Sequence, residues 1–177
     1  MATGSVTGIE RLLDRVEKRQ QPLDNDFLEQ VAVEIAKIFR AQPDEVAIME
    51  LSAAGKTLKF VLPEKLQAVG SIPLTSTTAL AARTARERRA DIINNFASSR
   101  HASVFEGVPL GRSQGASIQK IISVPVLRGN QVIGVAQISR KGDTPGESGP
   151  DFTSKDLSEL QGLNTALARF LALRATA

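Results

Sequence analysis

The stretch Ile118–Lys141 (IQKIISVPVLRGNQVIGVAQISRK) is the strongest indication of the fold in this chain. Two runs rich in Val and Ile flank Gly129-Asn130, a pair that readily adopts the positive φ angles of a two-residue β-hairpin turn. Both arms carry apolar residues on both faces, which indicates strands in the middle of a sheet that is covered on each side. Gly134 has no side chain, so we expect a helix or a ligand to approach the backbone closely there.

The remaining sequence predicts helices and shorter strands around this hairpin. In the first half of the chain, apolar spacing and turn residues predict a narrow amphipathic helix over 9–16, a core helix from about 24 to 41, a hairpin of 45–51 and 57–62, and an edge strand at 71–74. A helix over 75–89, a short strand at 91–94 and a long polar loop over 95–117 are predicted before the central hairpin. After it, the sequence predicts a flexible connection over 142–151 and one closing helix over 153–171. This order predicts an α+β fold with a central antiparallel sheet of five to six strands and helices on one or both faces.

Length and composition limit the possible functions. The 177 residues fit one domain at 22–177 preceded by a helical extension at 1–21. No apolar run reaches the length of a membrane span, and the first twenty residues lack the apolar centre of a signal peptide, so we expect a cytoplasmic protein without membrane contact. The chain has no cysteine, which excludes disulfides, thiolate metal sites and cysteine nucleophiles.

Charge and aromatic content argue against nucleic-acid binding. The net charge is only +3, and Arg83–Arg89 is the single dense basic cluster. The chain has no Trp or Tyr, and its seven Phe residues are scattered, so no aromatic platform for stacking bases is predicted. The arginine cluster is interpreted as a solvated helix face, with anion binding as the alternative.

The combined order of elements and motifs resembles that of a GAF domain, a small-molecule sensory module of signalling proteins. Three segments carry the resemblance: Ser123–Val126, Gln131–Val135 and Phe152–Leu157. They correspond to a serine-apolar-Pro strand, an "iG" strand and a Phe-containing helix entrance. The resemblance extends from about Leu23 to Ala172 and implies a regulatory function; PAS-like and profilin-like folds share the same kind of antiparallel sheet.

Some GAF domains that bind cyclic nucleotides carry an Asn-Lys, spacer, Phe-x-x-x-Asp-Glu signature. Lys141, Phe152 and Asp156 match it, whereas Arg140 stands in place of Asn and Leu157 in place of Glu. The resemblance implies that Lys141 and Asp156 form a structural pair between the end of a strand and the start of a helix. An acidic residue in the first turn of a helix also interacts favourably with the helix dipole.

The resemblance also implies a ligand pocket between the sheet and the 95–117 loop. The candidate ligand-binding residues are Asn94, Asn95, Phe96, His101, Phe105 and Ser123. The alternative is that the polar members satisfy their own turns. His101 is the only histidine, so no coordination set for haem or a transition metal is predicted. We expect no catalytic group, no metal and no cofactor.

Two hypotheses follow. The first is a regulatory domain whose effector, an unidentified small molecule, enters under the 95–117 loop and shifts the terminal helices on closure. The second is an interaction protein that dimerises and binds no ligand. Both predict a homodimer through the apolar stripes of the 9–16 and 157–171 helices, and a separate polypeptide as the output protein.

Overall fold

The structure, a computed structural model, describes residues 3–96 and 117–176. Within these residues the chain forms a six-stranded antiparallel sheet and five α-helices. The helices are α1 (Thr3–Glu17), α2 (Asn25–Phe39), α3 (Leu80–Glu87), α4 (Ser154–Gly162) and α5 (Asn164–Thr176). The strands are β1 (Val46–Leu51), β2 (Thr57–Leu62), β3 (Ser71–Pro73), β4 (Asp91–Ile93), β5 (Ser117–Arg128) and β6 (Gln131–Gly142). The predicted α+β class and sheet are confirmed.

The hairpin of β5 and β6 forms the long centre of the sheet. The strand order is β3-β2-β1-β6-β5-β4, with every neighbouring pair antiparallel. Arg128 pairs with Gln131 across the two-residue turn, where Gly129 has a φ of 61°. A Cβ on Gly134 would clash with the Met49 carbonyl oxygen and with the Leu171 side chain. The predicted close approach is therefore made by β1 and α5.

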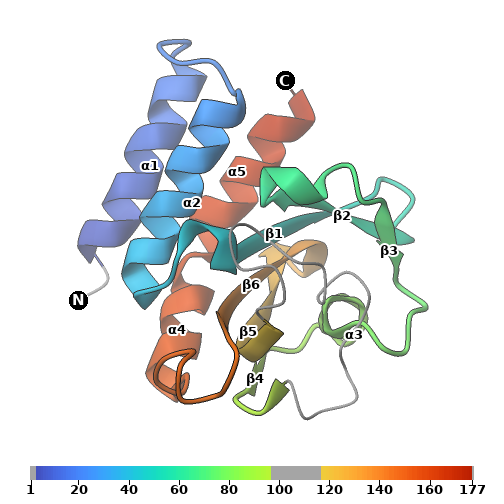
Figure 1. Ribbon diagram of the computed structural model, residues 1–177. Coiled ribbons are helices and arrows are strands. Elements are labelled where there is room, and N and C mark those ends of the chain that lie inside the picture. Colours follow the sequence, from blue (N-terminus) through green and yellow to red (C-terminus); the bar gives the residue numbers. More distant parts are fainter. Residues whose placement is uncertain (1–2, 97–116, 177) are drawn as a thin grey trace.

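Helices cover both faces of the sheet. In Figure 1, α1, α2 and α5 lie side by side at the upper left, α4 lies below α5, and α3 lies apart from them at the lower right. We call α1, α2, α4 and α5 the helix layer. Its apolar residues share one core with Ile48, Ile122 and Ile138 of the sheet. Smaller clusters pack α3 against the opposite face, for example through Met49 and Val135.

The apolar stripe of α1 is buried within the same chain. Ile9 and Leu13 are completely buried, and Leu12 is 7% exposed, in the core that α2 and α5 share. The expected dimer was inferred from an unpartnered stripe on this helix, and the structure supplies an intramolecular partner for it. The dimer itself stays a prediction, and it needs a different surface.

The closing segment is two helices, where the sequence predicted one. α4 ends at Gly162 and α5 begins at Asn164. The Asn164 side chain accepts a hydrogen bond from Leu127 N (2.7 Å) and donates one to Leu127 O (2.9 Å). The break therefore lets an amide side chain satisfy both backbone groups of Leu127, which lies at the register shift between Val126 and Leu127, and this contact depends on the tertiary fold.

No helix of the described segments is both long enough and apolar enough to span a membrane.

Candidate functional site

The face of the sheet that packs against α3 carries a row of polar side chains. We call this surface the α3 face. Along β6 the residues alternate, so that Ala136 and Ile138 enter the core of the helix layer while Gln137 and Ser139 point to the other side. Lys141 follows at the end of the same row. The alternation therefore places three polar residues in line on a mostly buried surface.

Ser123 lies at the centre of a closed hydrogen-bond network on this face. Its Oγ lies 2.7 Å from Thr84 Oγ1 of α3 and accepts a hydrogen bond of 3.1 Å from Gln137 Nε2. The Thr84 hydroxyl donates to Leu80 O at 3.0 Å, so Ser123 must donate its own proton to Thr84. Ser123 and Thr84 are completely buried. Such a satisfied network fixes α3 to the sheet, and this is the contribution of Ser123 that the structure shows.

Lys141, at the end of the row formed by Gln137 and Ser139, carries a charge that is partly buried. Lys141 Nζ donates to Asp44 O at 3.1 Å, while Lys141 N donates to Glu45 Oε2 at 2.6 Å. Burial lowers the pKa of Lys141 from its usual 10.5, and the carboxylates of Asp44 and Glu45 oppose this shift. The ammonium group is thus held in a partly desolvated position where its charged form is disfavoured.

A small cavity of about 30 Å³ lies against these residues. The described residues around it are Asp44, Glu45, Ala47, Phe60, Leu66, Ile118, Ile121, Gln137, Ser139 and Lys141. Polar groups from β6 and the turn before β1 form one part of this lining, and apolar side chains form the other. The volume suits one or two water molecules and is far below the several hundred Å³ of a typical ligand pocket.

The predicted site residues take different positions. Asn94 donates to Phe152 O at 3.1 Å and accepts from Phe152 N at 2.8 Å, so it holds the end of β4 to the segment before α4. Phe96 is 2% exposed and belongs to a small cluster with Leu80 and Ile121. Asn95 is exposed.

Two further predicted contacts, His101 and Phe105, lie outside the described residues. Of the predicted set, the structure brings Ser123 and Phe96 to the α3 face, and it turns Asn94 toward Phe152.

The expected pair of Lys141 with Asp156 is corrected by the structure. Lys141 contacts the turn before β1, as described above, while Asp156 belongs to a capping box at the start of α4. Asp156 Oδ2 accepts from Thr153 N at 2.8 Å, and Thr153 Oγ1 accepts from Asp156 N at 3.3 Å. The Asp156 carboxylate is therefore engaged at the start of its own helix, where the side chains of Asp156 and Thr153 each accept a hydrogen bond from the backbone N–H of the other residue.

Sequence reasoning missed Gln137, Ser139 and Glu45. A signal for the first two was present, because polar residues occupy alternate positions in an otherwise apolar strand. Glu45 carried no such signal: its carboxylate accepts from the backbone of both Gln42 and Lys141, and the second contact spans 96 residues.

The GAF domain family model matches residues 25–172. The chain belongs to the GAF domain family. A crystal structure of the GAF domain from an Acinetobacter phosphoenolpyruvate-protein phosphotransferase shares 16% identity with it, at a TM-score of 0.64 and with 97% of this chain and 95% of that chain covered. Residues 122–287 of a methyl-accepting chemotaxis protein give 14% identity, a TM-score of 0.65 and coverages of 93% and 98%.

A third similar structure is an enzyme. The free methionine-R-sulfoxide reductase from Neisseria meningitidis, in complex with its substrate, shares 16% identity with this GAF domain, at a TM-score of 0.58 and with coverages of 97% and 93%. No curated protein sequence matches the chain. These structural likenesses establish the GAF fold, which carries both regulatory and enzymatic members.

Proposed function

We propose that this GAF domain is a regulatory module that binds a small polar effector on the α3 face. The observation that carries the proposal is Lys141, a partly buried ammonium whose pKa is lowered by desolvation and whose hydrogen-bond partner in the described residues is one backbone carbonyl. A Lys ammonium has three donors and its burial is costly when they are incompletely used. An effector with an acceptor or anionic group would use the remaining donors.

The neighbouring groups favour a polar molecule with an apolar part. Ser139 and Gln137 precede Lys141 in the row, and Phe60 and Ile121 line the same cavity. The cavity is too small for a metabolite as it stands, so effector binding must include a local opening of this surface. The contacts predicted for His101 and Phe105 remain predictions.

A regulatory activity is preferred over catalysis. GAF domains are mostly regulatory, but a sulfoxide reductase is among the structural neighbours. The chain has no cysteine, so a mechanism that uses a thiol is not available to it. We further propose that the domain forms a homodimer in the cytoplasm and transmits the effector signal to a separate output protein.

The small cavity also favours a second candidate, an interaction protein that dimerises without a ligand. Native mass spectrometry of the full chain purified from its host, followed by denaturation, separates the two candidates. The regulatory module predicts a bound small molecule that is released on denaturation. A chain that carries no extra mass would instead support the interaction protein.

The released compound should then be titrated calorimetrically into Lys141→Met. We expect its binding to weaken by about tenfold or more, the loss of one charge-assisted hydrogen bond, while the melting temperature stays the same or rises because a desolvated charge is removed. Lys59→Met is the matched control, since Lys59 is an exposed lysine of β2. Unchanged binding to Lys141→Met would place the effector elsewhere.

A further inference from the structure

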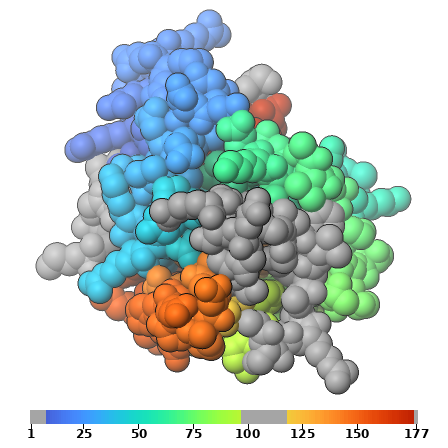
Figure 2. Space-filling model, in the orientation of Figure 1, coloured from blue at the N-terminus to red at the C-terminus, as the bar shows by residue number. Residues whose placement is uncertain are grey.

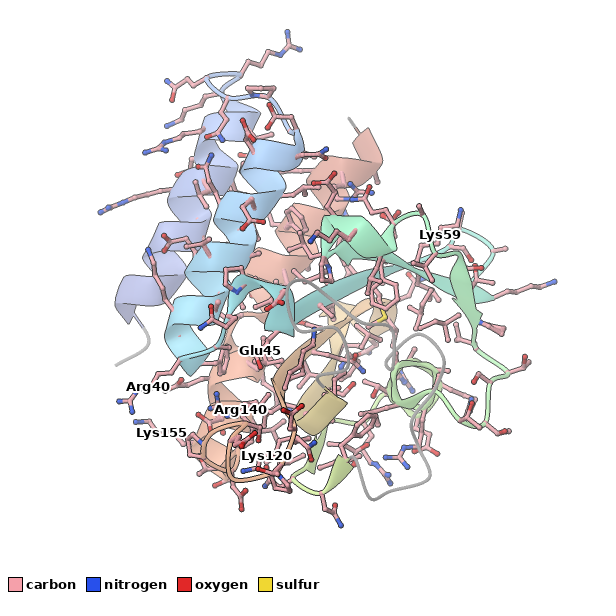
Figure 3. All side chains as sticks on the ribbon, viewed as in Figure 1. Arg40, Glu45, Lys59, Lys120, Arg140 and Lys155 are labelled. Carbon is pink, nitrogen blue, oxygen red and sulfur yellow. The ribbon has the colours of Figure 1, made fainter. Side chains whose placement is uncertain are left out.

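Two buried cations face each other on the opposite side of the sheet from Lys141. Lys120 of β5 and Arg140 of β6 are direct cross-strand partners. Each residue is only 5% exposed. Figure 3 shows them together near Lys155 at one end of the sheet, whereas Lys59 lies at the other end. Like charges at directly opposed positions of an antiparallel pair destabilise the sheet, so this arrangement needs compensation.

The described residues compensate these charges incompletely. The Arg140 guanidinium carbon lies 4.4 Å from the centre of the Phe152 ring, and the buried Nε has no hydrogen-bond partner among the residues that the structure describes. None of the carboxylates in the described segments forms an ion pair with Arg140. Lys120 Nζ donates to Gly149 O at 2.6 Å and pairs with Asp151 Oδ1 at 2.9 Å.

Asp151 is a weak counter-ion because its side chain is 68% exposed. Asp151 lies at the end of the loop that follows β6. This loop is orange in Figure 2 and forms part of the molecular surface. An ion pair with one solvated partner contributes little, and a buried guanidinium without a hydrogen-bonded anion is costly. The cluster around Lys120 and Arg140 therefore holds two buried cations and one solvent-exposed carboxylate.

We propose that this cluster is an anion site that takes a phosphate group, either as free phosphate or as the phosphoryl group of a small molecule. A tetrahedral oxyanion offers several acceptors, which matches the planar donors of Arg140 and the ammonium of Lys120. It enters by displacing Asp151 from Lys120, because the exposed carboxylate marks where the site meets solvent. Lys155, in the first turn of α4, adds positive charge at the same end of the sheet.

This site is independent of the proposed effector surface. Arg140 packs on Phe152, which belongs to the core of the helix layer, while Lys141 points to the α3 face. Successive residues of one strand point to opposite sides, so β6 presents a cation to each face of the sheet.

The test is the shift in melting temperature of the full chain on addition of sodium phosphate, against sodium chloride of equal ionic strength, with affinities measured by calorimetry. We expect phosphate to stabilise the wild type, and Arg140→Gln to weaken its binding by about tenfold or more. Asp151→Asn should lower the melting temperature in chloride but increase the phosphate shift, because it removes the competing carboxylate. Arg174→Gln is the matched control, since the buried Nε of Arg174 also lacks a hydrogen-bond partner within the described part of the chain, but its guanidinium pairs with Glu50.

Glycerol phosphate, used in parallel, distinguishes the two sources of the anion: tighter binding than phosphate indicates a phosphorylated molecule, and weaker binding indicates free phosphate. The proposal is overturned if neither anion stabilises the wild type beyond chloride. It is also overturned if phosphate raises the melting temperature of Asp151→Asn no more than that of the wild type. This variant should fold, because the Asp151 side chain is exposed. An equal shift in a folded Arg140→Gln would show that Arg140 only packs on Phe152.

Discussion

At the scale of single residues, the buried polar groups of this GAF domain differ in how far their hydrogen-bond demand is met. Ser123 is completely satisfied by Thr84 and Gln137, so its burial costs little and it holds α3 in place. Arg140 and Lys141 are cations with few partners in the described residues, and their burial opposes folding. Buried polar residues whose hydrogen-bond donors are incompletely used are therefore better candidates for ligand binding than residues that are fully hydrogen-bonded.

Asp156 is hydrogen-bonded within the capping box of α4, so its removal should destabilise the fold. Asp156→Ala removes the acceptor of Thr153 N and breaks the capping box of α4. We expect the free energy of unfolding to fall by about 1 kcal/mol, with a drop of a few degrees in melting temperature. A double-mutant cycle in urea should give coupling with Thr153→Ala and none with Lys141→Ala. Coupling to Lys141 alone would restore the pair that the sequence suggested.

At the scale of elements, α1 is fixed to α5 by charge as well as by apolar contact. Arg169 of α5 donates to Asp14 Oδ1 at 2.6 Å and to Glu17 Oε2 at 2.7 Å. Hydrogen bonding to Arg169 lowers the pKa of both carboxyl groups from their usual 3.8 and 4.5, and raises the pKa of the guanidinium. The two helices at the ends of the chain are therefore joined directly in the helix layer.

This contact predicts an acid dependence of stability. Because both carboxyl pKa values are lower in the folded state, the unfolded state binds protons first as the pH falls. The stabilisation by Arg169 is complete above the usual carboxyl pKa values and is lost as the pH falls through the folded ones. The free energies of unfolding of wild type and Arg169→Gln, measured in urea, should thus differ near neutral pH and become equal at acidic pH.

Arg88→Gln is the control for this experiment, because Arg88 donates to the Asn130 carbonyl and its partner cannot titrate. If the difference in free energy of unfolding between wild type and Arg169→Gln is constant from neutral to acidic pH, the ion pairs of Arg169 with Asp14 and Glu17 do not stabilise the fold.

The elements could be predicted from sequence where the determinants are local. The hairpin of β5 and β6 follows from apolar runs around Gly129-Asn130, and Pro73 correctly placed β3 at an edge. The pairing of Lys120 with Arg140 could not be predicted, because it depends on the register shift between Val126 and Leu127, which lies between this pair and the turn. A slip of one residue would turn Lys120 to the other face, and nothing local in the sequence specifies that shift.

At the scale of the whole molecule, the outer side of α1 and α2 offers a surface for the proposed dimer. A groove of about 720 Å³ runs between these helices. Arg11 and Arg15 of α1 line it together with Glu29 and Glu34 of α2. In Figure 1 this helix pair forms one side of the molecule, away from α3 and β4. A patch with basic and acidic edges is self-complementary under a two-fold axis, as an isologous interface requires.

The last prediction tests this geometry by charge reversal. In an antiparallel contact, Arg11 and Arg15 of one protomer face Glu29 and Glu34 of its partner. The double variants Arg11→Glu/Arg15→Glu and Glu29→Arg/Glu34→Arg should each place like charges opposite one another and weaken self-association by about tenfold or more. Mixed in equal amounts, the two variants should associate again, because in the mixed dimer acidic groups face basic groups at both contact sets. Sedimentation equilibrium at micromolar concentration measures all three samples.

Lys59→Glu, which reverses an exposed charge on β2 outside the groove, is the control and should associate like the wild type. A monomeric wild type at these concentrations would refute the dimer itself. A dimer that both double variants retain would refute this groove as its interface but keep dimerisation, and the remaining surfaces of the helix layer would then carry it. Rescue on mixing is the decisive result, because a general loss of folding in either variant cannot produce it.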